Sequence, residues 1–599
     1  MFWKMRRRRD LASGLLALLP IVASADGRVV VERGASRTAF PGDDGRLVYA
    51  VDARGNRLPD FSFVGYHGGE RAIPDVPVRV TLHPVEGDNT AAIQAAIDRV
   101  GAMPADEDGL RGAVLLARGR YRVEGSLHIR HSGVVLRGEG AGPDGTVLVA
   151  SGYGHPRYRR TFIRVGDNAR IQVDEASRRE IVDDFVPIGA HSFTVASAEG
   201  YRVGDRVAVY RPSTAEWIRA IGMDRIPSNW RPIRDLRWER EGDAPGLYYR
   251  RQGLAGHQRY PKRPDESWED FMERLPISED RTRMDLTRQW EPGTYDFYFE
   301  RTITAIDGNR ITIDAPNVHP LDAAFGGGAI YRYETPDRVF EVGIEDLYLV
   351  AEFAEPAPGH PYGHPREARR AENHAWHGIR LQRNTENTWV RNVTGNYFGW
   401  SLVSASGTRA TVTDCVSLGH ASRIAGGRRY PFMINGQLNL VQRCVTFEGR
   451  HEFVNQSRTA GPNVFVDCIG FDSRSNAGPH HRYAIGNLYD NVRSERPMES
   501  RNRGRSGTGH GWAGTQTCFY NCVAPRFLVG APPGGISWVI GSGAEDEEDL
   551  RVSPPSLYYR QLQDRLGEAA VDRLATPAQR SGMGTFDWVE ERVRAARGQ

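Results

Sequence analysis

The feature that most constrains this chain is a short segment that recurs through its second half. Each copy has an apolar or aromatic residue, one or two mostly polar residues, Cys or Asn, and then Val or Ile. The Cys or Asn positions are 392, 415, 444, 468, 491 and 522, which are 23, 29, 24, 23 and 31 residues apart. Short strands at such intervals predict the coils of a parallel β-solenoid, in which one position per coil forms an inward-facing ladder.

A solenoid also accounts for the length and for the cysteines. The chain has 599 residues, more than one ordinary globular domain holds, whereas repeat folds lengthen by stacking similar units. Four of the five cysteines occupy the recurring position, and Cys518 lies close to the last one. We therefore expect these cysteines to be buried core residues rather than disulfides, metal ligands or nucleophiles.

The region before the repeats carries a family resemblance. The run DNTAAIQAAI at 88–97 predicts a helix with an apolar face, and strands are expected at 113–117, 121–123, 127–129 and 134–137. Together with VLLARGRY at 114–121 and VLRGEG at 135–140, this run resembles the opening of the pectate-lyase superfamily. The resemblance covers 80–150 and, by coil pattern, 340–525. It implies an all-β, right-handed parallel β-helix whose open end is capped by that helix.

The rhythm of the coils is interrupted once. Between 155 and 335 the pattern changes to apparent antiparallel strands, with a hairpin turn at Asp307-Gly308-Asn309. The predicted organisation is a signal peptide at 1–25, the first part of the β-helix with its capping helix at 26–154, an inserted small β-domain at 155–335, the main coils at 336–530, and a C-terminal cap with a tail helix at 531–599.

The N-terminus is typical of export. Four arginines at 6–9 precede an apolar stretch at 11–23, and Ala23-Ser24-Ala25 forms a small-x-small cleavage site. A membrane anchor is the alternative, but the apolar stretch is too short to span a bilayer. We expect cleavage after Ala25, a secreted or periplasmic protein, and no membrane association afterwards.

Charge narrows the class of partner. The formal net charge is only +3, so the chain lacks the basic field of a nucleic-acid-binding protein. Lys4 and Lys262 are the only lysines, which makes a lysine base improbable. Arginine is the better bidentate partner for carboxylates and sulfates. The expected partner is therefore an acidic polysaccharide.

Histidine, arginine and aromatic residues concentrate between 372 and 512. Four arginines also lie fourteen residues after a recurring position: Arg429, Arg458, Arg482 and Arg505. Stacked coils would bring these residues to one face. The candidate catalytic residues are His480, His481, Arg482, Tyr483 and His510. The candidate substrate-binding residues are Arg458, Arg429, Tyr430, His451, Asn455, Asn502, Arg503, Trp512, His374 and Trp376.

These residue types fit β-elimination of a uronate. The C5 proton becomes acidic only when the neighbouring carboxylate is neutralised, here by Arg458 and Arg482. His480 or His481 is the expected base, and Tyr483 or His510 the expected acid. The rings of Trp512, Trp376 and Tyr430 would stack on sugar rings.

Two other functions stay open. A glycoside hydrolase on the same fold would need a pair of carboxyl groups at the groove, and a non-catalytic carbohydrate-binding protein would need no histidine placed for proton transfer. We expect no metal site and no cofactor. Calcium stays an open alternative, although the acidic calcium cluster of pectate lyases is not recognisable. No motif specifies the sugar, the linkage or the oligomeric state.

Overall fold

The structure is a computed structural model. It describes residues 27–599 except 154–158, 233–235, 242–243, 250–257, 262–266, 268–269, 271–272, 280–281, 355–372, 425, 546 and 582–587. The predicted signal peptide therefore lies outside the described residues. Within the described residues, no helix has the length and apolar character needed to cross a membrane.

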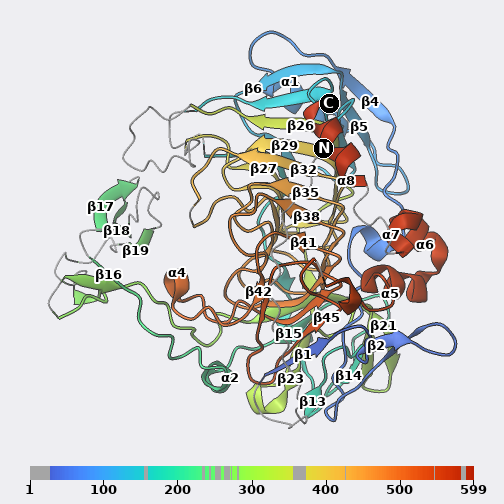
Figure 1. Ribbon diagram of the computed structural model, residues 1–599, viewed down its shortest axis with the longest axis vertical. Coiled ribbons are helices and arrows are strands. Elements are labelled where there is room, and N and C mark those ends of the chain that lie inside the picture. Colours follow the sequence, from blue (N-terminus) through green and yellow to red (C-terminus); the bar gives the residue numbers. More distant parts are fainter. Residues whose placement is uncertain are drawn as a thin grey trace.

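The molecule is a right-handed parallel β-helix, with its axis vertical in Figure 1. One long parallel sheet runs along it and contains 18 strands. Its strands are β1 (Arg28–Glu32), β4 (Val78–Leu82), β5 (Gly112–Leu116), β6 (Gly119–Val123), β8 (Val134–Arg137), β9 (Thr146–Ala150), β26 (Gly343–Ala351), β29 (Trp389–Tyr397), β31 (Thr411–Thr413), β32 (Val416–His420), β34 (Leu440–Gln442), β35 (Val445–Phe447), β37 (Asn463–Val466), β38 (Ile469–Phe471), β40 (Ala484–Asp490), β41 (Arg493–Ser494), β43 (Gly514–Tyr520) and β45 (Ile536–Ile540).

A second parallel sheet completes the coils. Its seven strands are β7 (Leu127–Ile129), β10 (Thr161–Val165), β27 (His377–Leu381), β30 (Ser401–Ala405), β33 (Phe432–Ile434), β36 (Phe453–Asn455) and β39 (Gly478–Pro479). Short pairs lie beside the two sheets: β2 (Ala39–Pro41) with β3 (Leu47–Tyr49), β25 (Val339–Phe340) with β28 (Thr385–Glu386), and β42 (Met498–Ser500) with β44 (Phe527–Val529).

The predicted ladder mixes two neighbouring positions. Val390 and Val412 are register partners, so Asn392 aligns with Asp414, and Val393 aligns with Cys415. Residues at the first position turn the corner of the coil with positive φ, 54° at Asn392 and 58° at Asp414. Asn and Asp tolerate this left-handed conformation better than other residues. The prediction that Asn392 and Asn491 point inward was therefore wrong by one residue.

The cysteines are core residues, as predicted. All five are free and buried, and Cys415, Cys444, Cys468 and Cys522 belong to the main hydrophobic core. An inward asparagine ladder exists elsewhere. Asn439 Oδ1 accepts from the Ala410 amide at 2.8 Å, and Asn463 Oδ1 accepts from the Asn439 amide at 3.0 Å. Each side chain thus supports the coil that precedes it.

Helix α1 (Thr90–Gly101) lies at the end of the solenoid near β5 and β6 (Figure 1). Its buried face contributes Ile93, Ile97 and Val100 to the same core as the first coils. The amide of Thr90 is capped by the Asp88 carboxylate at 3.0 Å. The apolar spacing therefore gives a helix that closes the core at this end.

Residues 172–334 form a separate antiparallel sheet. It contains β11 (Gln172–Val173), β12 (Arg179–Glu180), β14 (Ser192–Thr194), β15 (Arg206–Arg211), β21 (Phe297–Asp307), β22 (Arg310–Ile313) and β24 (Ala329–Glu334). Other elements of the insertion are β13 (Phe185–Val186), β23 (Leu321–Asp322), β16 (Trp230–Pro232), β20 (Arg283–Asp285), β17 (Leu236–Glu241), β18 (Ala244–Tyr249), β19 (Gln258–Pro261) and α2 (Ala215–Ala220). The predicted hairpin turn at 307–309 joins β21 to β22.

The insertion packs against the coils. Its core includes Trp217 and Trp290 from the insertion itself, together with Tyr483 and Ile485 from the β-helix. In Figure 1 the insertion places β15, β21 and β14 at the lower end. It is therefore fixed to the later coils and can shape a site there.

The two ends of the chain add to the solenoid in ways that the sequence did not predict. Strand β1 pairs in parallel with β45, so the N-terminal segment forms the last coil together with residues 536–540. The coils therefore extend past the predicted end at 530. The other α-helices in the part of the chain that the structure describes are α4 (Ser506–Gly509), α5 (Leu557–Leu566), α6 (Glu568–Asp572), α7 (Pro577–Ser581) and α8 (Trp588–Arg597).

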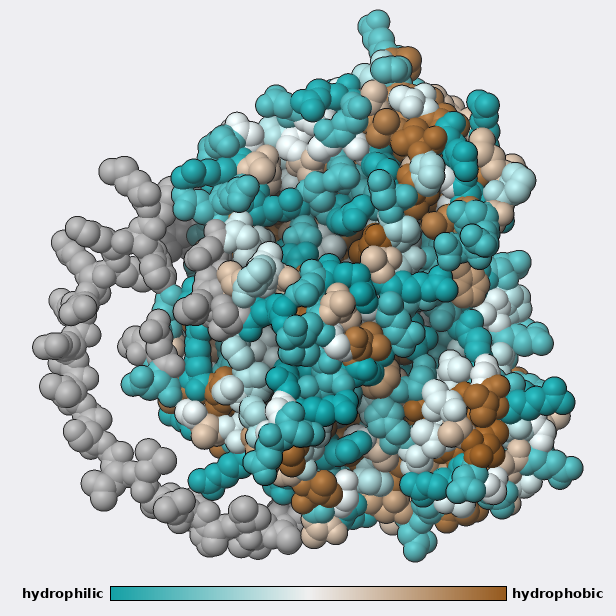
Figure 2. All heavy atoms as spheres, turned by 90° about the vertical axis from the view of Figure 1, so that its right-hand side faces the viewer, coloured by the Kyte–Doolittle hydropathy of each residue, from teal (hydrophilic) through white to brown (hydrophobic). Residues whose placement is uncertain are grey.

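Helices α5 to α8 line the right-hand side of Figure 1, which faces the viewer in Figure 2. Figure 2 shows polar residues over most of this face, with hydrophobic residues in separate small groups. Under the helices, Tyr558 and Leu562 pack with Leu488 and Tyr520 of the long sheet.

Candidate active site

A line of rings follows successive coils beside the second sheet. His377 and Ser401 are register partners, so Trp376 and Trp400 occupy equivalent positions, and their ring centroids are 6.0 Å apart. Tyr430 in the next coil lies 6.1 Å from Trp400. Since each coil contributes one ring, the line runs parallel to the solenoid axis.

The line ends in four histidines that contact one another. The His480 ring centroid lies 4.6 Å from His451, 4.7 Å from His481 and 5.2 Å from His510. The centroids of His481 and His510 are 5.0 Å apart. Tyr430 contacts His451 and His480 at 5.0 and 5.2 Å. We call these four histidines and Tyr430 the histidine cluster.

Hydrogen bonds give the cluster a direction. Tyr430 Oη accepts from Arg450 Nη1 at 3.1 Å and from the Gly427 amide at 3.4 Å. Its hydroxyl proton is then left for His480 Nε2, which lies 3.2 Å away. His480 Nδ1 in turn lies 2.8 Å from His481 Nδ1. A hydroxyl that donates to Nε2 requires the His480 proton on Nδ1, so His480 donates to His481, which keeps its own proton on Nε2.

The buried histidines are neutral at neutral pH. Burial lowers the pKa of His480 well below its usual value, and His451 and His481 lower it further. Burial also lowers the pKa of His481, with additional effects of His510 and Arg482. Burial also lowers the pKa of His451, and the positive charge of Arg450 lowers it further. Neutral imidazoles can both accept and donate a proton.

Arginines without carboxylate partners lie beside the cluster. Arg482 donates to the Thr508 carbonyl at 3.0 Å, and Arg458 donates to the Thr294 carbonyl at 2.8 Å. Burial lowers the pKa of Arg482, and so do Arg288 and Arg458. In the described part of the chain, no carboxylate lies within ion-pair distance of the guanidinium groups of Arg482, Arg458 and Arg288. Unbalanced positive charge of this kind favours an anionic ligand.

The carboxylates near the cluster are already paired. Glu499 contacts Arg501 and Arg503, both at 3.2 Å. Glu448 contacts Arg429 at 3.5 Å and Arg474 at 3.7 Å. Neither glutamate forms a carboxyl pair with another acid in these contacts.

The structure brings together most of the predicted catalytic residues and some of the predicted binding residues. Tyr430, His451, His480, His481 and His510 form the cluster. Arg503 donates to the His480 carbonyl at 2.6 Å. Arg458 and Arg482 lie in neighbouring coils, where the Arg458 amide donates to the Arg482 carbonyl. Trp376 joins the cluster through Trp400, and Arg159 and Arg428 lie over its ring at 5.0 Å each.

Tyr483 and Trp512 point to the insertion instead. Tyr483 is 1% exposed, and its hydroxyl lies 3.2 Å from His319 Nε2. Trp512 Nε1 donates to the Ile221 carbonyl at 3.0 Å. Both side chains are held by the insertion, whose packing could not be inferred from the neighbouring residues in sequence. Of the two expected acids, Tyr483 therefore has its hydroxyl at His319 of the insertion, whereas His510 lies in the histidine cluster.

Other predicted binding residues lie in the interior of the coils or in a loop away from the cluster contacts. Asn455 is fully buried and accepts from Tyr489 Oη at 2.7 Å inside the solenoid. His374 is fully buried beside the Tyr397 carbonyl at 2.9 Å. Arg429 is also buried, and it donates to the Ser422 carbonyl at 2.7 Å. Asn502 accepts from the Gly504 amide and shapes the exposed loop before α4.

The predicted arginine row is only partly present. Arg458 and Arg482 stack as described, whereas Arg429 precedes β33 and Arg505 stands exposed before α4. The coils differ in length, so a fixed offset reaches different positions in each of them.

Trp400 and Arg450 were missed. Trp400 lies one coil after Trp376, at a spacing of 24 residues, which the coil period could have revealed. Arg450 precedes His451, and only the fold shows that it reaches Tyr430. No group of three or more potential metal-binding side chains occurs among the residues that the structure describes.

No family model matches the chain, and no curated protein matches it. The solved structures similar to it include a tailspike of the Acinetobacter baumannii bacteriophage AP22 in complex with a capsular saccharide. That match has 10% identity and a TM-score of 0.24 over 76% of this chain, which spans 63% of the length of the tailspike.

Two further structures are similar at the same level. The tailspike protein of Pseudomonas phage LKA1 has 10% identity and a TM-score of 0.25, over 76% of this chain and 72% of its own. A protein described as a glycoside hydrolase has 10% identity and a TM-score of 0.25, over 80% of this chain and 99% of its own. At this similarity the evidence for the β-helix is the strand register of the chain itself.

Proposed function

We propose that this chain is an exported lyase that cleaves a uronate-containing polysaccharide by β-elimination at the histidine cluster. The directed chain of hydrogen bonds from Tyr430 through His480 to His481 supports this proposal, together with the neighbouring arginines, for which the described residues provide no carboxylate partner. The first part supplies proton transfer, and the second supplies the charge that a uronate needs.

His481 and His510 are the proposed acid and base. The base removes the C5 proton, its electron pair forms the C4–C5 double bond, and the C4–O bond breaks. We assign proton abstraction to His510. His481 Nε2 gives its proton to the leaving oxygen, while His480 donates to His481 and Tyr430 donates to His480. These roles reverse the sequence-based expectation, because the hydrogen bonds place the His481 proton on Nε2.

Arg450 stabilises the end of this relay. After the proton transfer Tyr430 would carry a negative charge, and Arg450 Nη1 already lies 3.1 Å from its oxygen. Charge-assisted hydrogen bonds of this kind are about twice as strong as neutral ones. The relay therefore avoids leaving an imidazolate at His481.

Arg482 and Arg458 are the proposed ligands of the substrate carboxylate. Neutralising this group makes the C5 proton acidic, and a guanidinium can bind a carboxylate through two parallel hydrogen bonds. The rings of Trp376 and Trp400 continue from the cluster along the coils, which suits stacking on neighbouring sugar rings. The polymer would then lie along the solenoid axis.

A hydrolase is less well supported. Glycosidases usually need two carboxyl groups on either side of the scissile bond. Glu499 and Glu448 are each held by two arginines instead.

The test is to incubate the purified protein with alginate, pectate, ulvan, glucuronan and glycosaminoglycans, each with calcium and with a chelator. Ultraviolet absorbance of an unsaturated uronate should rise with at least one polymer, and His481→Ala and His510→Ala should abolish the rise. New reducing ends without this absorbance would contradict elimination and indicate hydrolysis. The calcium and chelator arms decide whether a metal participates.

A further inference from the structure

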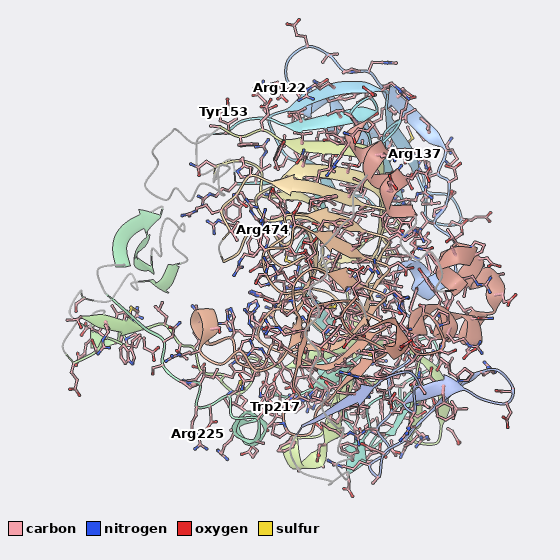
Figure 3. The ribbon with its side chains drawn as sticks, in the orientation of Figure 1. Arg122, Arg137, Tyr153, Trp217, Arg225 and Arg474 are labelled. Atoms are coloured by element: carbon pink, nitrogen blue, oxygen red, sulfur yellow. The ribbon has the colours of Figure 1, made fainter. Side chains whose placement is uncertain are left out.

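A large cavity lies apart from the histidine cluster, between the insertion and the last coil. Its volume is about 860 Å³. Its walls include Asp52 and Arg54 of the N-terminal segment, Arg28 and Ile536 near the β1–β45 pair, and residues of the insertion. Figure 3 shows the labelled Trp217, one of the lining residues, at the lower end of the molecule. None of the residues of the histidine cluster lines this cavity.

Arg211 is the unusual residue of the cavity. It is 3% exposed, and its Nη1 is buried without a hydrogen-bond partner among the described residues. Its guanidinium lies 3.8 Å from the centroid of Trp217. Burial lowers the pKa of Arg211 to about 10, so it remains charged at neutral pH. No carboxylate among the described residues forms an ion pair with Arg211, although the charge of Asp296 acts on it and opposes the effect of burial on its pKa. A buried cation without an ion-pair partner costs stability, unless a ligand supplies the anion.

The other polar groups of the cavity leave one positive charge in excess. Arg54 is paired to Asp322 at 2.9 Å, and its guanidinium lies 3.7 Å from the Phe185 ring. The remaining charged residues of the lining are Arg28 and Asp52. Three arginines against two aspartates favour a ligand with a single negative charge.

The cavity also offers rings and a hydrogen-bond acceptor. Trp217, Phe185 and Phe325 line it. His319 Nδ1 lies 2.9 Å from the Pro320 carbonyl, so Nδ1 carries the proton and Nε2 accepts from the Tyr483 hydroxyl at 3.2 Å. The carboxylate of Asp52, a half-buried residue of the lining, can accept from a ligand hydroxyl. Aromatic faces, this acceptor and an arginine together suit a sugar acid.

We propose that this cavity binds one monoanionic sugar acid, with its carboxylate on Arg211 and its ring against Phe185 and Phe325, the partly exposed rings of the lining. The site is separate from the cluster and does not depend on the reaction assigned to the cluster. It would hold a single uronate unit, either free or at the end of a chain.

The test is isothermal titration calorimetry of the protein with D-glucuronate and D-galacturonate, with D-glucose and inorganic sulfate as comparison ligands. At least one uronate should bind, and glucose and sulfate should not. Arg211→Met should weaken uronate binding at least about tenfold, because the charge-assisted bonds are lost. Ala324→Trp, at the exposed rim, should weaken binding by narrowing the cavity.

Two controls make the result specific. Arg225→Met changes an exposed arginine on the same insertion, paired to Asp224 on the surface and labelled in Figure 3, and it should leave binding unchanged. His481→Ala should also leave it unchanged, which separates this site from the cluster. Without ligand, the melting temperature of Arg211→Met should equal or exceed that of the original protein.

Three results would overturn the proposal. They are the absence of uronate binding, equal binding by glucose or sulfate, and full uronate binding by Arg211→Met. A marked loss of stability in Arg211→Met without ligand would instead identify Arg211 as a structural partner of Trp217.

Discussion

Tyr430 is the residue on which the proposed chemistry depends most. It is 1% exposed, and its hydroxyl lies between the guanidinium of Arg450 and the imidazole of His480. A phenol in this position can donate its proton to His480 without contacting the substrate. Tyr430 is thus a positioning and relay residue, whereas His481 and His510 would touch the sugar.

Tyr430→Phe tests the relay. The ring and its packing remain, but the proton source behind His480 is lost, so kcat should fall about 100-fold or more, with little change in KM. Steady-state kinetics on the polymer identified as substrate measures both constants. Tyr348→Phe, on the opposite sheet, is the matched control and should keep normal kinetics. An unchanged kcat for Tyr430→Phe would exclude the relay.

Arg482→Gln tests recognition of the carboxylate. Loss of a charge-assisted contact costs about 1.5–3 kcal/mol, so kcat/KM should fall about 10- to 100-fold. Arg474→Gln removes an exposed arginine that pairs only weakly with Glu448 and is labelled in Figure 3, so it should behave like the original protein. The same kcat/KM for both variants would argue against a role of Arg482 in substrate binding.

Sequence adjacency predicted part of this site and misplaced the rest. The cluster was expected because His480, His481 and His510 lie in Gly-rich loops of consecutive coils. Tyr483 lies only two residues from His481, yet it points to His319 of the insertion. Trp400 could have been found from the coil period of 24 residues after Trp376, whereas the position of Arg450 beside Tyr430 depends on the fold. A sequence shows the neighbours along the chain but not the face of a coil.

At the scale of elements, the repeat predicted the coils well and their register imperfectly. Val390 and Val412 correctly indicated strands, because β-branched residues are favoured in strands. Asn392 and Cys415 were aligned as one ladder, but the first turns a left-handed corner and the second is buried in the core. Because both side chains are small and partly polar, the sequence repeat alone does not distinguish the two positions.

Helix α5 docks on two buried aspartates. The Tyr559 hydroxyl donates to Asp467 at 2.6 Å. Ser556 Oγ and the Tyr558 amide donate to Asp490 at 2.7 and 2.8 Å. Burial raises the pKa of Asp467 to about 8 and that of Asp490 to about 7. Both aspartates are therefore protonated in the folded state at pH values where the unfolded chain is ionised.

This linkage predicts lower stability at higher pH. Between about pH 4 and the folded pKa, folding takes up a proton at each aspartate, so the free energy of unfolding falls by about 1.4 kcal/mol per group and pH unit. Above the folded pKa this loss levels off. Buried Glu452, whose pKa burial raises to about 8, adds to the same trend.

Asp467→Asn isolates one contribution. The amide oxygen can still accept from Tyr559, but no proton is taken up at this position on folding. Denaturant unfolding at pH 5, 6, 7 and 8 should therefore show a shallower loss of stability for the variant. Parallel pH profiles for the two proteins would show that Asp467 does not titrate in this range.

For the whole molecule, the solenoid joins residues from both ends of the sequence. Strand β1 pairs with β45, and α1 closes the opposite end. The cap was predictable from its apolar spacing. The pairing of β1 with β45 was not, because it joins segments about 500 residues apart and no local signal encodes such a contact.

Burial in the continuous core should also make the cysteine thiols unreactive in the folded protein. All five cysteines are free and buried, and burial raises the pKa of Cys415 and Cys444 well above the usual value. A thiol reagent should therefore label none of them in the folded protein. In guanidinium chloride without a reductant it should label all five. Fewer than five thiols after unfolding would reveal a disulfide and contradict the buried core.

Elimination at the histidine cluster is tested by the mass of the smallest oligosaccharide product, measured by mass spectrometry after digestion of the polymer that the protein cleaves. Elimination at the histidine cluster predicts products that are one water lighter than the saturated oligosaccharide, and none with His481→Ala. Exclusively saturated products from the original protein, or unsaturated products that persist in His481→Ala and His510→Ala, would contradict it.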